Sequence, residues 1–129
     1  MAKILVIDDE SVIVMVLEEV LQDAGHEVFT AADGLQGLEL LKKGLQPELL
    51  IIDLLMPGMG GRDFLKAVRA DFKLANLQVI LLTGSVPNER DFPPGDTYHD
   101  VICKPFNIDD VVMKANRLLN IPWIASYHN

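Results

Sequence analysis

The chain alternates between short apolar runs and longer stretches in which apolar residues recur every three or four positions. The short runs predict buried strands, and the longer stretches predict helices with one face against a core. Predicted strands cover residues 3–8, 26–31, 49–53, 78–83 and 101–104. Predicted helices begin near residues 11, 33, 61 and 107. Strands and helices therefore alternate along most of the chain.

Strands that alternate with helices pair in parallel through right-handed crossovers. We therefore predict an α/β fold in which helices cover both faces of a five-stranded parallel sheet. The expected topology is flavodoxin-like and doubly wound, with strand order 2-1-3-4-5. Residues 1–120 are expected to form this domain. Residues 121–129 form an apolar tail that folds over the body, pairs with another copy or marks truncation before a further domain.

One segment interrupts the alternation. Between the fourth and fifth strands, where a further helix belongs, the chain carries Pro87, Pro93, Pro94 and Gly95. A proline inside a helix costs about 3 kcal/mol or more, because it removes a hydrogen bond and clashes with the preceding turn. We expect an atypical fourth helix that is short, displaced or absent.

The ends and the apolar faces of the helices are also predicted. Ser11, Asp33 and Asn107 have short polar side chains that cap helix N-termini, and Gly25 and Gly44 are expected to end the first two helices. The apolar residues expected to face the core are, helix by helix, Ile13, Val16, Leu17, Val20, Leu21 and Ala24; Leu35, Leu38 and Leu41; Phe64, Leu65, Val68 and Phe72; and Ile108, Val111, Val112, Ala115, Leu118 and Leu119.

Composition and charge restrict the class of protein. Half of the 129 residues are hydrophobic and 23% are charged, which is a globular composition sufficient for one domain. The net charge of -8 opposes direct DNA binding, since nucleic-acid affinity comes largely from Lys and Arg. No apolar stretch has the length of a signal peptide core or a membrane span, so we expect a cytoplasmic protein without membrane insertion. Cys103 is expected to be a small buried residue, and His26, His99 and His128 to be structural or solvated.

Acidic residues follow two of the predicted strands at the edge where such sheets bind ligands. The crevice of this topology lies beyond the carboxyl ends of the first and third strands. The first strand leads into Asp8, Asp9 and Glu10, and the third ends at Asp53. Two carboxylates about 4 Å apart repel by about 4 kcal/mol at an effective dielectric constant of about 20, so the acids favour a divalent cation. The small number of protein ligands favours Mg2+.

The fourth and fifth strands end in a hydroxyl and an ammonium group, those of Thr83 and Lys104. Both arrive at the same edge of the sheet as the acids. An aspartate can attack phosphorus while a metal and a lysine neutralise the phosphoryl oxygens and a hydroxyl donates to one of them. Each residue alone has an ordinary structural explanation. Their coincidence at one edge indicates phosphoryl chemistry.

These residues resemble the receiver domain of response regulators, the proteins of two-component signalling, over residues 2–119. The resemblance is carried, in chain order, by KILVIDDE, TAADG, LLIIDLLMPGMGG, LLTG and CKPF. It implies that Asp53 accepts a phosphoryl group from a sensor histidine kinase or a histidine phosphotransfer protein in a Mg2+-dependent reaction. It also implies that the protein is a single-domain signalling switch for a downstream protein, and not an enzyme with an external substrate.

The resemblance assigns metal ligands as well. It implies that Asp9 ligates Mg2+ directly and that Asp8 acts mainly through water. Asp53 and the backbone carbonyl of Leu55 complete the protein ligands that it implies.

Other matched positions concern switching. Thr83 matches the family's switch hydroxyl, Lys104 the lysine that pairs with the phosphoryl group, and Pro105 a proline whose preceding peptide is usually cis. Val101 departs from the family, because relatives carry a Tyr or Phe whose ring turns inward when the switch hydroxyl moves. Gly60, where many relatives have Asp, is a milder departure. A second interpretation is therefore a receiver-like interaction module that keeps the fold and does not switch.

Two further classes use related chemistry or the same sheet. A Mg2+-dependent phosphatase of the haloacid-dehalogenase type also has an aspartyl nucleophile, but on its first strand in an Asp-x-Asp pattern and with a cap domain. In a flavin-binding protein, the acids after the first strand would repel the cofactor phosphate. Val12, Val14 and Met15 lie near these acids and are either docking residues for the phosphodonor or ordinary exposed apolar residues.

Overall fold

The computed structural model describes residues 2–71, 74, 76–84 and 91–121. The elements of this part of the chain are β1 (Lys3–Ile7), α1 (Ser11–Asp23), β2 (Glu27–Ala31), α2 (Gly34–Lys42), β3 (Leu49–Asp53), α3 (Gly61–Asp71), β4 (Gln78–Thr83), β5 (Asp100–Cys103) and α4 (Ile108–Leu118). The strands predicted at 49–53 and 78–83 have these bounds, those predicted at 3–8 and 26–31 differ by one residue at one end, and the one predicted at 101–104 is displaced by one residue. The predictions for Phe72, Pro87, His128 and the tail from residue 122 lie outside the described residues.

The strands form one parallel sheet in the order β2-β1-β3-β4-β5, which confirms the flavodoxin-like topology. β1 lies between β2 and β3, with Ile7 opposite both Ala31 and Ile52. The strand order reverses at this pair, so the chain leaves β1 and β3 toward opposite faces. The ends of these two strands therefore border an open crevice, which in such sheets is where ligands bind.

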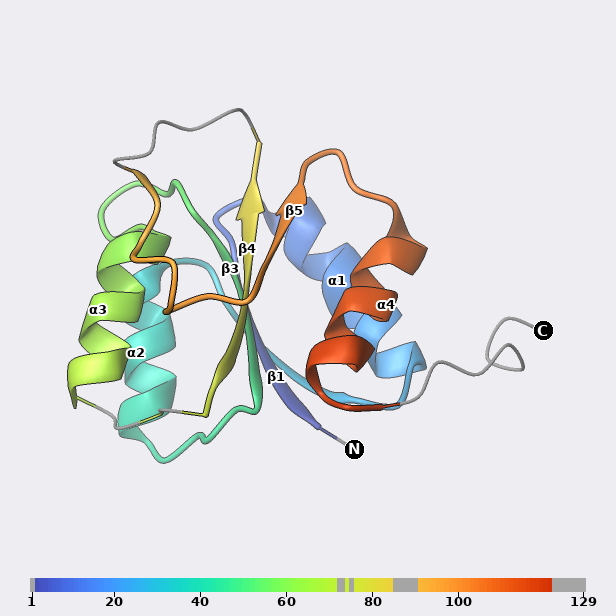
Figure 1. Ribbon diagram of the computed structural model, residues 1–129, viewed down its shortest axis with the longest axis horizontal. Helices are drawn as coiled ribbons and strands as arrows, with labels where there is room; N and C mark the ends of the chain where they lie inside the picture. The colour runs from blue at the N-terminus through green and yellow to red at the C-terminus, as the bar shows by residue number, and fades with distance from the viewer. Residues whose placement is uncertain (1, 72–73, 75, 85–90, 122–129) are drawn as a thin grey trace.

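Helices cover both faces of the sheet. Seen along the sheet edge in Figure 1, α2 and α3 lie on one side and α1 and α4 on the other. One apolar core fills the space under α2 and α3, and a second fills the space under α1 and α4. All five residues of β3 are buried, as expected for a parallel strand with a helical layer on each face.

The prediction that Leu35 faces the core is wrong. Leu35 is 64% exposed, whereas Gly34, Gly37 and Leu41 are the buried residues of α2. A Cβ atom at Gly37 would lie 2.5 Å from Cδ1 of Ile7, so α2 approaches the sheet too closely for a side chain there. The glycines thus rotate the buried face of α2 away from Leu35. Ile108, in the first turn of α4, is likewise exposed, against prediction.

Two of the three predicted N-caps are confirmed. Asp33 accepts a hydrogen bond from the backbone N–H of Gln36, and Asn107 accepts one from that of Asp109. Ser11 is the first residue of α1, and the N-cap position belongs to Glu10, whose side chain makes no capping hydrogen bond. The Glu10 carboxylate instead contacts Lys104, 94 residues away.

The described part of the connection between β4 and β5, residue 84 and residues 91–99, contains no α-helix, in keeping with the prediction of a helix that is short, displaced or absent. The guanidinium of Arg69 in α3 donates hydrogen bonds to the backbone carbonyls of Leu77 and Thr97, which fastens the connection to α3. The rings of Phe92 and Tyr98 stack with centroids 6.0 Å apart and pack on the core under α2 and α3. This anchored segment, rather than a regular helix, covers that part of the sheet.

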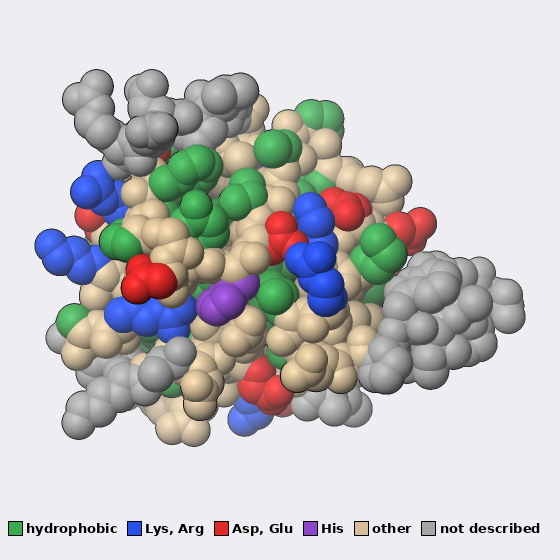
Figure 2. Space-filling view, in the orientation of Figure 1, with side chains coloured by type: hydrophobic (Ala, Val, Ile, Leu, Met, Phe, Trp, Pro, Cys, Tyr) green, Lys and Arg blue, Asp and Glu red, His purple; other side chains and the backbone are tan. Residues whose placement is uncertain are grey.

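Ion pairs fasten α4 to β5. Asp100 pairs with both Lys114 and Arg117, and Lys114 also pairs with Asp110, 3.3 Å away. Figure 2 shows basic side chains bordered by acidic ones on this side of the molecule.

Under α4, the buried ring of His26 is hydrogen-bonded to Asn116, 3.0 Å away, which confirms its structural role.

Cys103 is exposed, against the prediction that it is buried, because it lies at the end of β5, an edge strand. No helix among the described residues has the length and apolar character needed to cross a membrane.

Replacing Leu41 with Ala should lower the free energy of unfolding by about 2–5 kcal/mol, because it leaves a cavity under α2. Leu35→Ala is the matched control on the same helix and should change this free energy by less than about 0.5 kcal/mol. Urea denaturation measures both. Equal losses for the two variants would contradict the orientation of α2.

Candidate functional site

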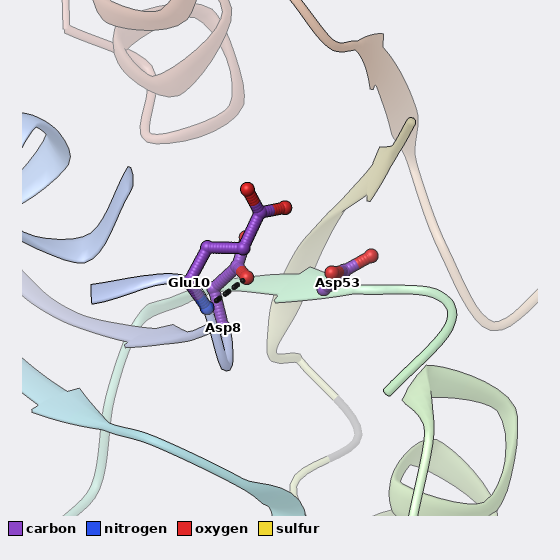
Figure 3. A group of neighbouring side chains, drawn as sticks. All are labelled: Asp8, Glu10 and Asp53. Atoms are coloured by element: carbon purple, nitrogen blue, oxygen red, sulfur yellow. Dashed lines mark hydrogen bonds between the residues drawn. The ribbon is translucent and has the colours of Figure 1, made fainter. Parts of the chain in front are cut away.

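Three carboxylates lie together at the crevice between β1 and β3. One oxygen from each of Asp8, Glu10 and Asp53 lies within 4.8 Å of the others (Figure 3). Asp8 and Asp53 are buried, with 1% and 5% of their surface exposed, and Glu10 is exposed. Burying like charges side by side is unfavourable unless cations or hydrogen bonds compensate.

Local backbone structure fixes the two buried acids. Asp8 follows the last residue of β1, and one of its carboxylate oxygens accepts a hydrogen bond of 2.9 Å from the backbone N–H of Glu10. Asp53 is the last residue of β3, and its Oδ1 lies 3.3 Å from the backbone nitrogen of Leu55. Short aspartate side chains commonly bond to the backbone two residues on at such turns. Both carboxylates are therefore held in place before any ligand arrives.

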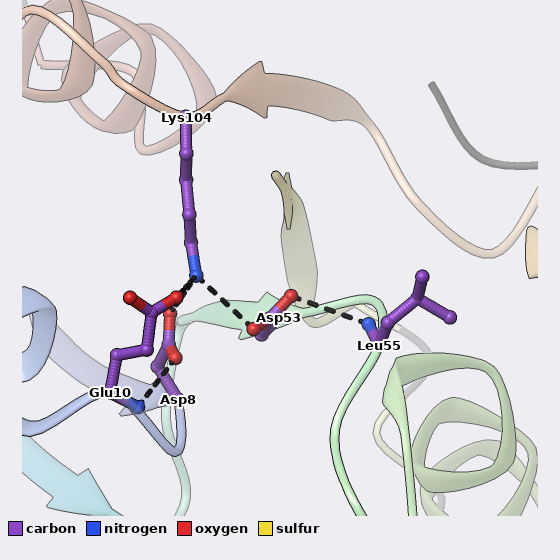
Figure 4. A network of polar contacts seen from close by, with 5 residues as sticks. All are labelled: Asp8, Glu10, Asp53, Leu55 and Lys104. Atoms are coloured by element: carbon purple, nitrogen blue, oxygen red, sulfur yellow. Dashed lines mark hydrogen bonds and ion pairs between the residues drawn. The ribbon is translucent and has the colours of Figure 1, made fainter. Parts of the chain in front are cut away.

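Lys104 supplies the positive charge of the site. It follows β5, and its backbone N–H donates a hydrogen bond of 2.7 Å to the carbonyl of Thr83. Its side-chain nitrogen Nζ lies 2.8 Å from Asp8 Oδ2, 2.8 Å from Glu10 Oε1 and 3.1 Å from Asp53 Oδ2 (Figure 4). Burial alone would lower the pKa of Lys104, but hydrogen bonds to these carboxylates outweigh it and raise the pKa. The ammonium group thus stays charged.

Asp53 is the perturbed acid of the group. Burial raises its pKa above the usual value, and the charge of Asp8 raises it further, while Lys104 and the Leu55 N–H oppose the shift in part. The Lys104 ammonium and the Leu55 N–H therefore do not fully offset the cost of a negative charge on the buried Asp53 carboxylate. An added cation at this crevice would favour the ionised carboxylate.

The remaining predicted residues have the following places. Thr83 is buried at the end of β4, next to Cys103 in the parallel pair. Leu55 lies in the loop after β3 with its side chain exposed. The peptide between Lys104 and Pro105 is cis, as the resemblance implies. Val101 is half-buried and packs on the same core, under α2 and α3, as the stacked rings of the β4–β5 connection.

Glu10 joins the group, whereas the exposed Asp9 lies outside the three carboxylates that come together. Glu10 is one of the acids after the first predicted strand, but it has no role in the predicted site. A signal was available in the spacing, because residues two apart in extended backbone project to the same side, and both Asp8 and Glu10 follow β1 directly. The role of Asp9 as a metal ligand stays a prediction.

The donor set fits a divalent cation. Three carboxylates against one ammonium leave an excess of two negative charges. Asp8 Oδ2 is buried, and among the described residues its contact is the Lys104 ammonium, 2.8 Å away, with no further hydrogen-bond donor. A buried carboxylate oxygen with spare acceptor capacity suits a metal ion or its water, and hard oxygen ligands suit Mg2+.

Comparisons with known proteins agree with this geometry. The chain is 33% identical over 114 residues to sporulation initiation phosphotransferase F of Bacillus subtilis, a match covering 84% of this chain and 86% of that protein. It is 34% identical over 118 residues to chemotaxis protein CheY-3 of Vibrio cholerae, covering 90% of each. The solved structure of chemotaxis protein CheY4 of Vibrio cholerae superposes with a TM-score of 0.83 at 34% identity, covering 92% of this chain and 98% of that one.

Longer proteins also match. The chain is 32% identical over 122 residues to the DNA-binding dual master transcriptional regulator RpaA of a Synechocystis species, and it spans about half of that protein, 49% of its length. The family model of the response regulator receiver domain matches residues 4–116. This chain therefore belongs to the response regulator receiver domain family.

Proposed function

We propose that Asp53 is the phosphoacceptor of a two-component signalling switch. The observation that carries the proposal is the position of the Asp53 carboxylate. It ends the central strand at the crevice, with Oδ2 3.1 Å from the Lys104 ammonium and Oδ1 beside the Leu55 N–H. A carboxylate fixed in this way, beside a cation that can neutralise phosphoryl oxygens, is arranged as a nucleophile toward phosphorus.

The reaction transfers a phosphoryl group from a histidine of a sensor kinase or phosphotransfer protein. A carboxylate oxygen of Asp53 forms the new bond to phosphorus as the phosphorus–nitrogen bond breaks, and the electron pair returns to the donor imidazole. Lys104 neutralises charge on the phosphoryl oxygens. Mg2+ supplies the remaining charge neutralisation and orients the oxygens when it is bound. Its proposed protein ligands are Asp8, Asp9, Asp53 and the backbone carbonyl of Leu55.

Thr83 connects the site to the rest of the fold. We assign its hydroxyl to a hydrogen bond with the phosphoryl group, which draws the end of β4 toward Asp53. Because the Thr83 carbonyl accepts the Lys104 N–H, β5 is linked to the same displacement. The affected surface then changes its affinity for a downstream protein.

Relatives of similar length support a protein partner for this signal. The named phosphotransferase and the chemotaxis protein are covered by the chain over 86% and 90% of their lengths. The net charge of -8 opposes binding of this domain to DNA. We therefore propose a cytoplasmic signalling domain that assists its own phosphorylation and is read by another protein.

A second function is favoured by two departures from the family. Val101 lacks the aromatic ring that relatives use as a relay, and the described part of the β4–β5 connection has no α-helix. A receiver-like module that binds its partner without switching would retain the fold with these features. Phosphorylation of Asp53 would then leave the affinity for the partner unchanged, whereas phosphorylation of a switch changes it.

Incubation with acetyl phosphate and Mg2+ should add one phosphoryl group to the protein, because Asp53 can attack a small donor as well as a phosphohistidine. Intact-mass spectrometry measures the addition. Omission of Mg2+ should abolish most of it. Asp53→Asn should abolish it, and Asp63→Asn, which removes an exposed acid from α3, should not. An unmodified wild-type protein that is folded and binds Mg2+ would contradict the proposed function.

Mg2+ should also raise the melting temperature (Tm) of the unphosphorylated protein. A ligand at ten times its Kd adds about 1.4 kcal/mol to the stability of the folded state, which corresponds to about 5 °C in Tm for a domain of this size. Asp53→Asn should lose most of this shift and Asp63→Asn should keep it. Thermal denaturation at constant ionic strength measures the shifts. Equal Mg2+ shifts for both variants would contradict a metal site at Asp53.

A further inference from the structure

Glu10 makes a contact that the proposed reaction does not use. Its Oε1 accepts a hydrogen bond of 2.8 Å from Lys104 Nζ, closer than the 3.1 Å hydrogen bond from the same nitrogen to Asp53 (Figure 4). An ammonium group has three N–H donors. One donor of Lys104 is therefore committed to Glu10 while Asp53 is unphosphorylated.

The three carboxylates around Lys104 differ in their freedom to move. The Asp8 side chain is 0% exposed and is tied to the backbone of residue 10, and the Asp53 carboxylate is the one to be modified. The Glu10 side chain is 59% exposed. Glu10 alone among the three can turn into solvent without leaving a charge buried.

A phosphoryl group on Asp53 would be neutralised by the same Lys104 ammonium that donates a hydrogen bond to Glu10. Its oxygens are acceptors like the Glu10 carboxylate, and the two groups repel each other because both are negative. The hydrogen bond from Lys104 to the Glu10 carboxylate must therefore break before Lys104 can pair fully with the phosphoryl group.

We propose that Glu10 is a positioning residue that acts through Lys104 and slows phosphorylation of Asp53. In the unphosphorylated protein, its carboxylate holds the ammonium within the acidic group. During transfer it competes with the phosphoryl oxygens for that ammonium. The inference rests on the proposed function and extends it to a residue that sets the rate of the reaction.

The variant Glu10→Gln tests this inference because it removes the charge and keeps the size of the side chain. Glu10 makes no capping hydrogen bond to α1, so the substitution leaves the start of that helix intact. A partly exposed ion pair typically changes an equilibrium by about two- to fivefold. The rate of labelling by acetyl phosphate at saturating Mg2+ should rise by about this factor. Glu19→Gln, which removes an exposed acid from α1, should leave the rate unchanged.

A double-mutant cycle separates action through Lys104 from simple repulsion of the donor. Labelling of Lys104→Met should be slower than that of the wild type, and adding Glu10→Gln to it should give no further change. An acceleration that persists without Lys104 would overturn the proposal, because Glu10 would then act on the incoming donor alone. An unchanged or slower rate for Glu10→Gln in the wild-type background would overturn it as well.

A measurement without phosphorylation tests the contact itself. In protein labelled with 15N at lysine, the side-chain signal missing from Lys104→Arg belongs to Lys104. Its protons should exchange with water faster in Glu10→Gln than in the wild type, and an unchanged exchange rate would contradict the contact. If the wild type takes up no phosphoryl group, the proposed function fails. If the wild type is labelled and Glu10→Gln behaves like it, only the role of Glu10 fails.

Discussion

The site depends on one ammonium group shared by carboxylates of two strand ends. Lys104 lies within 3.1 Å of oxygens from Asp8, Glu10 and Asp53, and without it the buried acids would repel each other uncompensated. Even with it, the pKa of Asp53 is raised, first by burial and then by Asp8. The fold thus holds an excess of negative charge at the crevice. This excess favours a divalent cation, which under the proposed function would offset it before a negatively charged phosphoryl group is transferred.

The sheet order is what brings these groups together. Parallel strands deliver their carboxyl ends to one edge, so residues 8, 53, 83 and 104 meet there despite their separation along the chain. The core on both faces makes the strands rigid, and the loops beyond them carry the chemistry. In the proposed function, the reaction of Asp53 depends on this edge of the sheet, whereas communication with a partner would depend on how far β4 and β5 can shift.

The sequence predicts the topology and most of the site because both follow from simple periodicity and from the chemistry of strand ends. It fails where close packing decides. Leu35 fits a helical period, yet Gly37 lets α2 approach the sheet and turns that side chain outward. The sequence also does not predict contacts between residues far apart along the chain. Glu10 and Lys104 are 94 residues apart, and no local pattern of residues indicates that their side chains meet. The same holds for Arg69 in α3. No sequence pattern predicts its hydrogen bonds to the backbone carbonyls of Leu77 and Thr97.

The most direct test of the central claim is a crystal structure of the protein grown with Mg2+ and beryllium fluoride, an analogue of the aspartyl phosphoryl group. We expect the fluoroberyllate on an Asp53 oxygen, with Lys104 Nζ and the Thr83 hydroxyl hydrogen-bonded to its fluorides. Mg2+ should lie between this group and the acids that follow β1. A fluoroberyllate bound at another carboxylate, or an Asp53 left unmodified with Mg2+ present, would contradict the assignment of Asp53 as the phosphoacceptor.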